Sequence, residues 1–473
     1  MLKSNIAWMK KNVPSDLKVW KGMIQDIDWS QVAAKTKLSL QRDKDRITAE
    51  FKEFAAMDTS AKIDWLMNGD RHLGYLYKKD AIAFARREWK GLKSVGYDFV
   101  GWLKIWGGML NMVMKDPVSI MLAVFEYHWF ASYLATPAVV DRSVFGRRGK
   151  LLQADFDMWV AITHWAEDLI ANLIMADAKI GGNQKINKRI IMFDEMTMAQ
   201  MMAGFPNLLG IPYQMIPVFM VSEMDQLTLI PYIDAIESYG LPSDTCPLPT
   251  AECGCAVKDE YPMCGQGFIA SSMPCDGSVM ATSFQDRRFS KFMPSYPLCM
   301  PVRYDDEDTT EMAAADMKDC IHWVEGLTGE TWNWDTYFAT MEKMNECTRL
   351  EMEKWEINKT HYPQLVGSSF ELFRKWNYEM DGGLFPEGLK TQRKICKTMM
   401  ETYEKKLPAY VGGYEKYRAL IWSCPAHFYA NFSNWLANCW GIYALTEMEA
   451  LNMTKMLNTT DKDELREAAD LII

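Results

Sequence analysis

The sequence predicts an α/β fold with a large helical lobe at its N-terminus, a parallel-sheet domain, a helical connecting region and the start of a second α/β domain. Two observations predict it. Residues 1–185 are rich in Lys, Glu, Ala, Met and Leu, and their apolar residues recur every three or four positions, as in helices. From Arg189 onward, short β-branched or aromatic runs alternate with helical segments and turn residues, which is typical of α/β domains.

The later regions follow in order. Residues 186–310 form the first predicted α/β domain, which contains a cysteine-rich loop, and residues 311–416 return to a helical pattern. A second α/β domain is expected over 417–473, with strands at RALIWS and WGIYAL. Two strands are too few to bury both faces of a parallel sheet. We therefore expect this domain to be incomplete or to be completed by another subunit.

Within the helical lobe, the segment Val100–Val140 is unusually apolar and rich in Trp and Met. It could form a docking surface, an acyl-chain channel or a membrane-surface helix. The simpler interpretation is a buried helix pair broken at Asp116-Pro117, because stripes of Met and aromatic residues normally fill cores.

Charge and hydropathy exclude some classes of protein. The net charge of -10 and the lack of a Lys/Arg-rich block argue against nucleic-acid binding, which requires basic residues that replace counterions. The N-terminus is charged and lacks the apolar core of a signal peptide, and no uncharged apolar run of about 18 residues is present. The sequence predicts a cytoplasmic protein without a transmembrane segment.

Cysteine placement is the most informative feature of the composition. All 11 cysteines lie at or beyond position 246, and a short segment holds five of them: Cys246, Cys253, Cys255, Cys264 and Cys275. In a cytosolic protein such density indicates metal binding or catalysis more often than disulfides. The spacing matches neither zinc-finger nor ferredoxin motifs, so a self-contained local site is not expected. The alternative is that these cysteines are small buried apolar residues.

Three stretches carry a resemblance to a known family: YIDAIESYGLPSDTCPLP, SSMPCDGSVMATSFQDRRF, and the region from PLCMPVRYDDEDTTEM to TGETWNWDTYF. Together they resemble the 2-hydroxyacyl-CoA dehydratase and benzoyl-CoA reductase family over roughly residues 186–445. Three parts are diagnostic. The first is a Cys-Pro pair at Cys246, in a loop expected to follow a strand; the others are a Cys-Asp pair at Cys275 and the later motif TGETWNWD. The resemblance implies Rossmann-like or flavodoxin-like parallel-sheet domains.

The resemblance also implies an oxygen-sensitive cofactor. In this family a four-iron four-sulfur (4Fe-4S) cluster sits between two similar α/β domains on three cysteines, with one iron left open. Cys246 and Cys275 would be the first two ligands. The third family ligand comes from a later loop of the second domain, which this sequence does not reach, and Cys424 is a substitute at an unexpected position.

The implied reaction removes water from a 2-hydroxyacyl-CoA through a ketyl radical. Its electron would come from a separate ATP-dependent iron-sulfur activator, since this chain has no GxxxxGK[ST] phosphate loop. A homologous second subunit is expected to form a heterodimer with the chain. One alternative is reduction of an aromatic acyl-CoA of the benzoyl-CoA type. Another is a non-catalytic partner subunit or assembly protein whose cysteines hold no open iron.

Three further residues are candidates for acid-base catalysis. His427, two residues after Pro425, would face a ligand at the end of a strand, where α/β sheets bind ligands. Glu223 and Glu237 precede the cysteine-rich loop and would act as acid or base near the cluster. The simpler alternative for His427 is a hydrogen-bonded structural histidine. For Glu223 and Glu237 it is a surface or helix-capping role.

Overall fold

The structure of the protein is a computed structural model. Apart from positions 53 and 225, it describes residues 51–67, 92–136, 149–180, 189–193, 202–271, 293–298, 307–366, 385–406, 415–421 and 441–447, together with scattered single positions.

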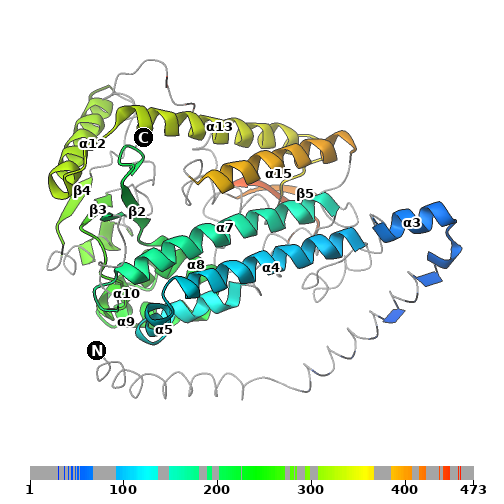
Figure 1. Ribbon diagram of the computed structural model, residues 1–473, viewed down its shortest axis with the longest axis horizontal. Helices are drawn as coiled ribbons and strands as arrows, with labels where there is room; N and C mark the ends of the chain where they lie inside the picture. The colour runs from blue at the N-terminus through cyan, green and yellow to red at the C-terminus, as the bar shows by residue number, and fades with distance from the viewer. Residues whose placement is uncertain are drawn as a thin grey trace.

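The N-terminal part is helical wherever the structure describes it. Its elements are α3 (Thr59–Met67), α4 (Leu92–Lys115), α5 (Pro117–Glu126), the 3-10 helix η3 (His128–Ala135) and α7 (Gly149–Ala176). Figure 1 shows α4 and α7 running side by side. The predicted break between α4 and α5 is confirmed: Asp116 caps α5 by accepting a hydrogen bond from Ser119 N at 3.1 Å, and Pro117 occupies the first turn.

A parallel sheet follows the helices. It consists of β1 (Arg189–Phe193), β2 (Leu208–Pro212), β3 (Gly267–Ser271) and β4 (Ser295–Leu298), in the order β2-β1-β3-β4. Every pair of neighbours is parallel. This arrangement confirms the α/β prediction, while assignment to a Rossmann-like or flavodoxin-like domain stays a prediction. The chain crosses from β2 over β1 to β3, so the strand order reverses between β1 and β3, the place where open α/β sheets bind ligands.

Several short helices connect β2 to β3. They are the π-helix η6 (Met215–Phe219), α8 (Met220–Met224), the 3-10 helix η7 (Gln226–Leu229), α9 (Ile230–Glu237) and α10 (Pro247–Val257).

The second half returns to helix, as predicted. It contains α12 (Glu307–Thr328), α13 (Trp334–Asn358) and α15 (Pro386–Glu404), followed by the parallel pair β5 (Tyr417–Ile421) and β6 (Ile442–Glu447). The two strands predicted at RALIWS and WGIYAL are therefore confirmed within two residues at each end. The three boundaries between the four proposed domains, at 185, 310 and 416, stay predictions.

The helical lobe and the sheet share one hydrophobic core. It joins Trp159 and Ile170 of α7 to Met192 of β1, Phe268 of β3 and Met399 of α15. Burial of such large side chains is the main stabilising contribution to folding. The lobe and the sheet are therefore packed on each other.

Among the described residues, no single helix is long and apolar enough to cross a membrane. The segments Phe99–Lys115 and Pro117–Glu126, bent by 98° at Asp116, meet the length and composition criteria only when taken together.

Candidate functional site

Cys246 lies at the N-terminus of α10, and its side chain is exposed. Its carbonyl oxygen accepts hydrogen bonds from Thr250 N at 3.2 Å and Thr250 Oγ1 at 2.7 Å, which fixes the first turn of the helix. Pro247 occupies the first helical position, where no amide hydrogen is needed. The dipole of α10 favours a negatively charged group at this end. The site therefore suits a thiolate.

The element that precedes Cys246 differs from the prediction. The sequence predicted a strand-loop before the Cys-Pro pair, but the structure places α9 there, followed by a turn. Pro231 lies in the first turn of α9, and Tyr232 and Ile236 are buried four residues apart, on one face of a helix. The helical spacing of these apolar residues explains why the segment is not a strand.

The other described cysteines of the cysteine-rich segment are buried. Burial raises the pKa of the Cys253 thiol to about 12 and raises the pKa values of Cys255 and Cys264 well above the usual range. These three side chains pack as small apolar groups. For these three cysteines, the alternative that they are small buried apolar residues therefore holds. Within the part of this segment that the structure describes, Cys246 alone has an exposed side chain.

The middle of α10 is anchored at the carboxyl edge of the sheet. Glu252 of α10 is buried and accepts a hydrogen bond from Gln214 Nε2, two residues beyond the end of β2. Tyr213 N donates to Phe193 O at 2.8 Å, and the Tyr213 ring stacks on Tyr261 at 4.0 Å between centroids. Cys246 therefore belongs to a helix held at the edge where parallel sheets bind ligands.

The helices α9 and α10 touch at a glycine. A Cβ atom at Gly254 of α10 would lie 2.0 Å from the carbonyl oxygen of Tyr232 in α9. Because the obstacle is backbone, no side-chain rotation relieves the clash. Only glycine permits the observed packing of the helix that carries Cys246.

Cys275 lies outside the described residues, between the end of β3 and a residue that packs on α9 and α10. It follows Ser271, the last residue of β3, by four positions. Ala281, six positions further on, is buried against Ile236 of α9 and Cys253 of α10. The described residues that flank Cys275 in sequence are thus the carboxyl end of β3 and a residue packed on the α9–α10 pair.

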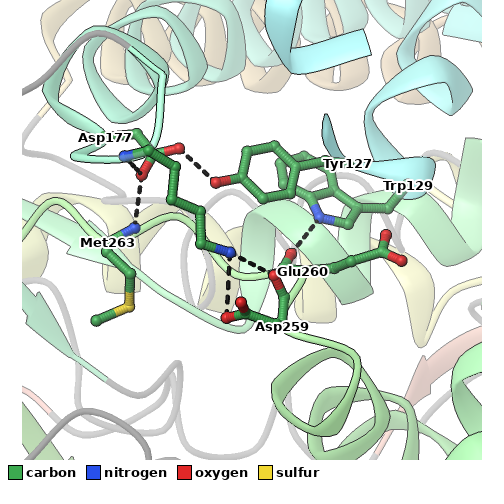
Figure 2. A network of polar contacts seen from close by, with 7 residues as sticks. Tyr127, Trp129, Asp177, Asp259, Glu260 and Met263 are labelled. Atoms are coloured by element: carbon green, nitrogen blue, oxygen red, sulfur yellow. Dashed lines mark hydrogen bonds and ion pairs between the residues drawn. The ribbon is translucent and has the colours of Figure 1, made fainter. Parts of the chain in front are cut away.

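A buried polar network fixes the other end of α10, and Figure 2 shows the part of it in which Trp129 binds the backbone of Glu260. The carboxylate of Glu260, three residues beyond α10, accepts hydrogen bonds from Tyr232 OH at 2.5 Å and His128 N at 2.9 Å. The carbonyl oxygen of Glu260 accepts from Trp129 Nε1 at 2.8 Å. His128 and Trp129 belong to η3, so the helical lobe holds the C-terminal end of the helix that carries Cys246.

Asp177 completes this network from the end of α7 (Figure 2). Its carboxylate accepts hydrogen bonds from Tyr127 OH, from Met263 N at 2.9 Å and from Lys179 N at 3.1 Å. Burial raises the pKa of Asp177, although these hydrogen bonds oppose the shift. Lys179 also forms an ion pair with Asp259, at 3.1 Å between Nζ and Oδ1. The lobe, whose contacts the sequence left open, is thus a support for the site.

The Tyr232 hydroxyl is a suitable test of this support. Tyr232→Phe removes the hydrogen bond to Glu260 and the acceptor for Trp129 N at 3.2 Å. We expect the free energy of unfolding to fall by roughly 1–3 kcal/mol, because buried polar groups lose partners. Urea unfolding followed by circular dichroism measures it. Tyr239→Phe, at an exposed tyrosine just after α9, is the matched control and should change little. Equal stability of the two variants would contradict a supporting role for the network.

In the part of the chain that the structure describes, none of the three predicted acid-base residues is placed beside Cys246. Glu237 is the last residue of α9 and is half-buried, and Glu223 lies in α8, where its side chain is not described. His427 and the proposed ligand Cys424 fall outside the described ranges. In the described part of the chain, no group of three or more His, Cys, Asp or Glu residues is arranged to hold a metal ion. The roles of these residues stay predictions.

Glu167 is a buried carboxyl that the sequence did not single out. It lies in α7 and lines a cavity of about 20 Å³, which has room for one water molecule. Burial raises the pKa of Glu167 to about 8, against the opposing effect of Lys115. Its Oε1 atom has no hydrogen-bond partner among the described residues. Gly108 of α4 makes room for it, since a Cβ there would lie 1.9 Å from Glu167 Oε2.

The fold and the site define a class: a mixed α/β protein with an exposed thiol at the N-terminus of a helix whose middle is held at the carboxyl edge of a parallel sheet. The family model described as 2-hydroxyglutaryl-CoA dehydratase, D-component, matches residues 226–472, more than half of the 473-residue chain. The chain belongs to this family, which confirms the resemblance seen in the sequence. The family is one of dehydratase components, so membership implies a lyase-type function on CoA thioesters and a partner subunit. No curated protein matches the chain.

Proposed function

We propose that this chain is the iron-sulfur subunit of an ATP-activator-dependent 2-hydroxyacyl-CoA dehydratase. The observation that carries the proposal is the position of Cys246: its side chain is exposed at the N-terminus of a buried helix whose middle is held at the carboxyl edge of the sheet. The neighbouring Cys253, Cys255 and Cys264 are buried. Family membership supplies the substrate class, a CoA thioester.

The chemistry of the donors fits a 4Fe-4S cluster. Cysteine thiolates are the natural ligands of such clusters, and the N-terminus of α10 favours the negative charge of the Cys246 thiolate. Cys275 and Cys424 are the further ligands we propose. When bound, the cluster supplies one electron and a Lewis-acidic iron, which allow hydroxide to leave an otherwise unactivated 2-hydroxyacyl thioester by way of a ketyl radical.

The residues of the chain itself would position this chemistry and move protons. The Gln214–Glu252 contact and the Glu260 network hold α10, and with it Cys246, at the edge of the sheet. Glu223, Glu237 and His427 are the groups we propose for proton transfer. The electron would come from an ATP-dependent activator protein, and a homologous subunit would complete the enzyme in an anaerobic cytoplasm.

Iron analysis tests the cluster. The chain purified without oxygen is expected to hold about four irons and as many acid-labile sulfides, with absorbance at roughly 400 nm. Cys246→Ser should lose most of this iron without unfolding, because the side chain is exposed. The matched control is Cys255→Ala, which removes a buried thiol from the same helix and should keep the iron. An iron-free wild type, or a Cys246→Ser variant that keeps its iron, would refute the proposal.

Turnover then separates the alternatives. The complete enzyme, reduced by its activator, should consume a 2-hydroxyacyl-CoA and leave benzoyl-CoA unchanged. The opposite result would assign the chain to the aromatic reductases. A colourless chain that is needed for turnover would indicate a non-catalytic partner subunit.

A further inference from the structure

Helix α4 has two apolar faces. One face is buried in the core shared with α7 and contains Ile105, Met109 and Met112. The other face carries five exposed side chains: Phe99, Leu103, Trp106, Leu110 and Met114. We call these five residues the α4 seam. Each of them is more than half exposed. A helix that is apolar nearly all round is normally buried on both sides, so the α4 seam is expected to be covered.

The spacing of the α4 seam suits another helix. Its members are separated by four, three, four and four residues, close to the helical period of 3.6, so the five side chains form one line along α4 that a second helix can cover. The positions beside the line include Val100 and Gly107, which carry no charge. Lys115 lies away from the line and is paired with Asp168 of α7.

The α4 seam is also symmetric about its midpoint, between Trp106 and Gly107. In an antiparallel pair of identical helices, Phe99 would face Met114 and Leu103 would face Leu110. Trp106 would face Gly107, where a Cβ would meet nothing within 4 Å. The missing side chain leaves room for the indole ring of the other copy. A surface that matches itself in this way is what a two-fold symmetric contact requires.

We propose that two copies of this chain associate through their α4 seams, antiparallel, around a two-fold axis that passes beside Trp106 and Gly107. Exposed apolar residues continue beyond the bend onto α5, at Val118 and Met121, and enlarge the contact. A typical dimer buries roughly 800 Å² per partner, which one helix face alone does not supply. The proposal is independent of the dehydratase function, because α4 lies outside residues 226–472 and contains no cysteine.

Sedimentation velocity of the purified full-length chain tests the proposal over a range of roughly 1–100 μM. The wild type is expected to dimerise, and Leu103→Glu should weaken the dimer about 100-fold or more, since it buries a charge at the centre of the contact. Met312→Glu, at an equally exposed apolar residue of α12, is the matched control and should dimerise like the wild type. Circular dichroism verifies that each variant is folded.

A pair of introduced opposite charges tests whether the two α4 helices of the dimer are antiparallel. In the double variant Leu103→Glu with Leu110→Lys, each introduced glutamate faces an introduced lysine only if the helices are antiparallel. Dimerisation should then return. The proposal is overturned if the wild type stays monomeric over the whole range, if Leu103→Glu dimerises normally, or if the double variant remains monomeric. A monomeric wild type that floats with phosphatidylcholine/phosphatidylglycerol vesicles would instead assign the α4 seam to a lipid surface.

Discussion

Glu167→Gln is expected to raise the free energy of unfolding by roughly 2 kcal/mol at pH 7. The pKa of Glu167 is raised to about 8 by burial, from the ordinary value of 4.5. Each pKa unit between the folded and unfolded states corresponds to about 1.4 kcal/mol, which gives about 3.4 kcal/mol over the 2.5 units between pH 4.5 and pH 7. Partial solvent screening in the cavity reduces this to roughly 2 kcal/mol.

The stability gain of Glu167→Gln is expected to depend on pH. Between pH 4.5 and about 8, Glu167 is ionised in the unfolded chain and still protonated in the folded one. The unfolded state therefore binds fewer protons, and the stability of the wild type falls as pH rises through this window. Glutamine does not titrate, so the advantage of Glu167→Gln should be absent below pH 4.5 and grow up to about pH 8.

Urea unfolding curves recorded across this pH window measure the difference. Asp168→Asn is the matched control: it changes the adjacent acid, which is exposed and paired with Lys115. It should alter stability by no more than about 0.5 kcal/mol at any pH. If the profiles of Glu167→Gln and the wild type run parallel from pH 5 to pH 8, Glu167 is not buried in its protonated form.

Gly254→Ala is expected to lower the free energy of unfolding by roughly 3 kcal/mol and to reduce the iron content of the purified chain. The added methyl group would meet the backbone of Tyr232 at 2.0 Å, so α9 and α10 must move apart. Because α10 carries Cys246 at its N-terminus, this movement would displace the proposed ligand. Thermal unfolding and iron analysis of the same preparation measure the two effects.

Gly326→Ala supplies the control for this substitution. Gly326 also lies in a helix, α12, but a Cβ there meets nothing within 4 Å. Alanine in an exposed helix should stabilise the chain by roughly 0.5–1 kcal/mol and leave the iron content unchanged. Wild-type stability in Gly254→Ala would show that the α9–α10 contact adjusts at little cost.

Local sequence patterns predicted much of the fold. The apolar spacing of α4 and α7, the break at Asp116-Pro117 and the short β-branched or aromatic runs of β1, β5 and β6 all depend on residues that are close in sequence. The wrong prediction, a strand before Cys246, came from the resemblance, and the helical spacing of Tyr232 and Ile236 in α9 shows what the residues themselves favoured.

For the candidate site, the sequence found the cysteines but not their environments. It placed Cys246 in a dense cluster, yet only burial distinguishes its exposed side chain from those of Cys253, Cys255 and Cys264. It also gave no sign that Glu260 would bind His128, which is 132 residues away. Such contacts between distant segments carry no local pattern.

The sequence by itself determined the N-terminal helices, the strands β1, β5 and β6, the family and the cysteine-rich segment, because periodicity and motifs are properties of neighbouring residues. Only the tertiary structure decided which thiol is exposed, which carboxyl is protonated and which face of α4 remains uncovered. The physical reason is that exposure and desolvation depend on everything that packs around a group, and most of those neighbours come from distant parts of the chain.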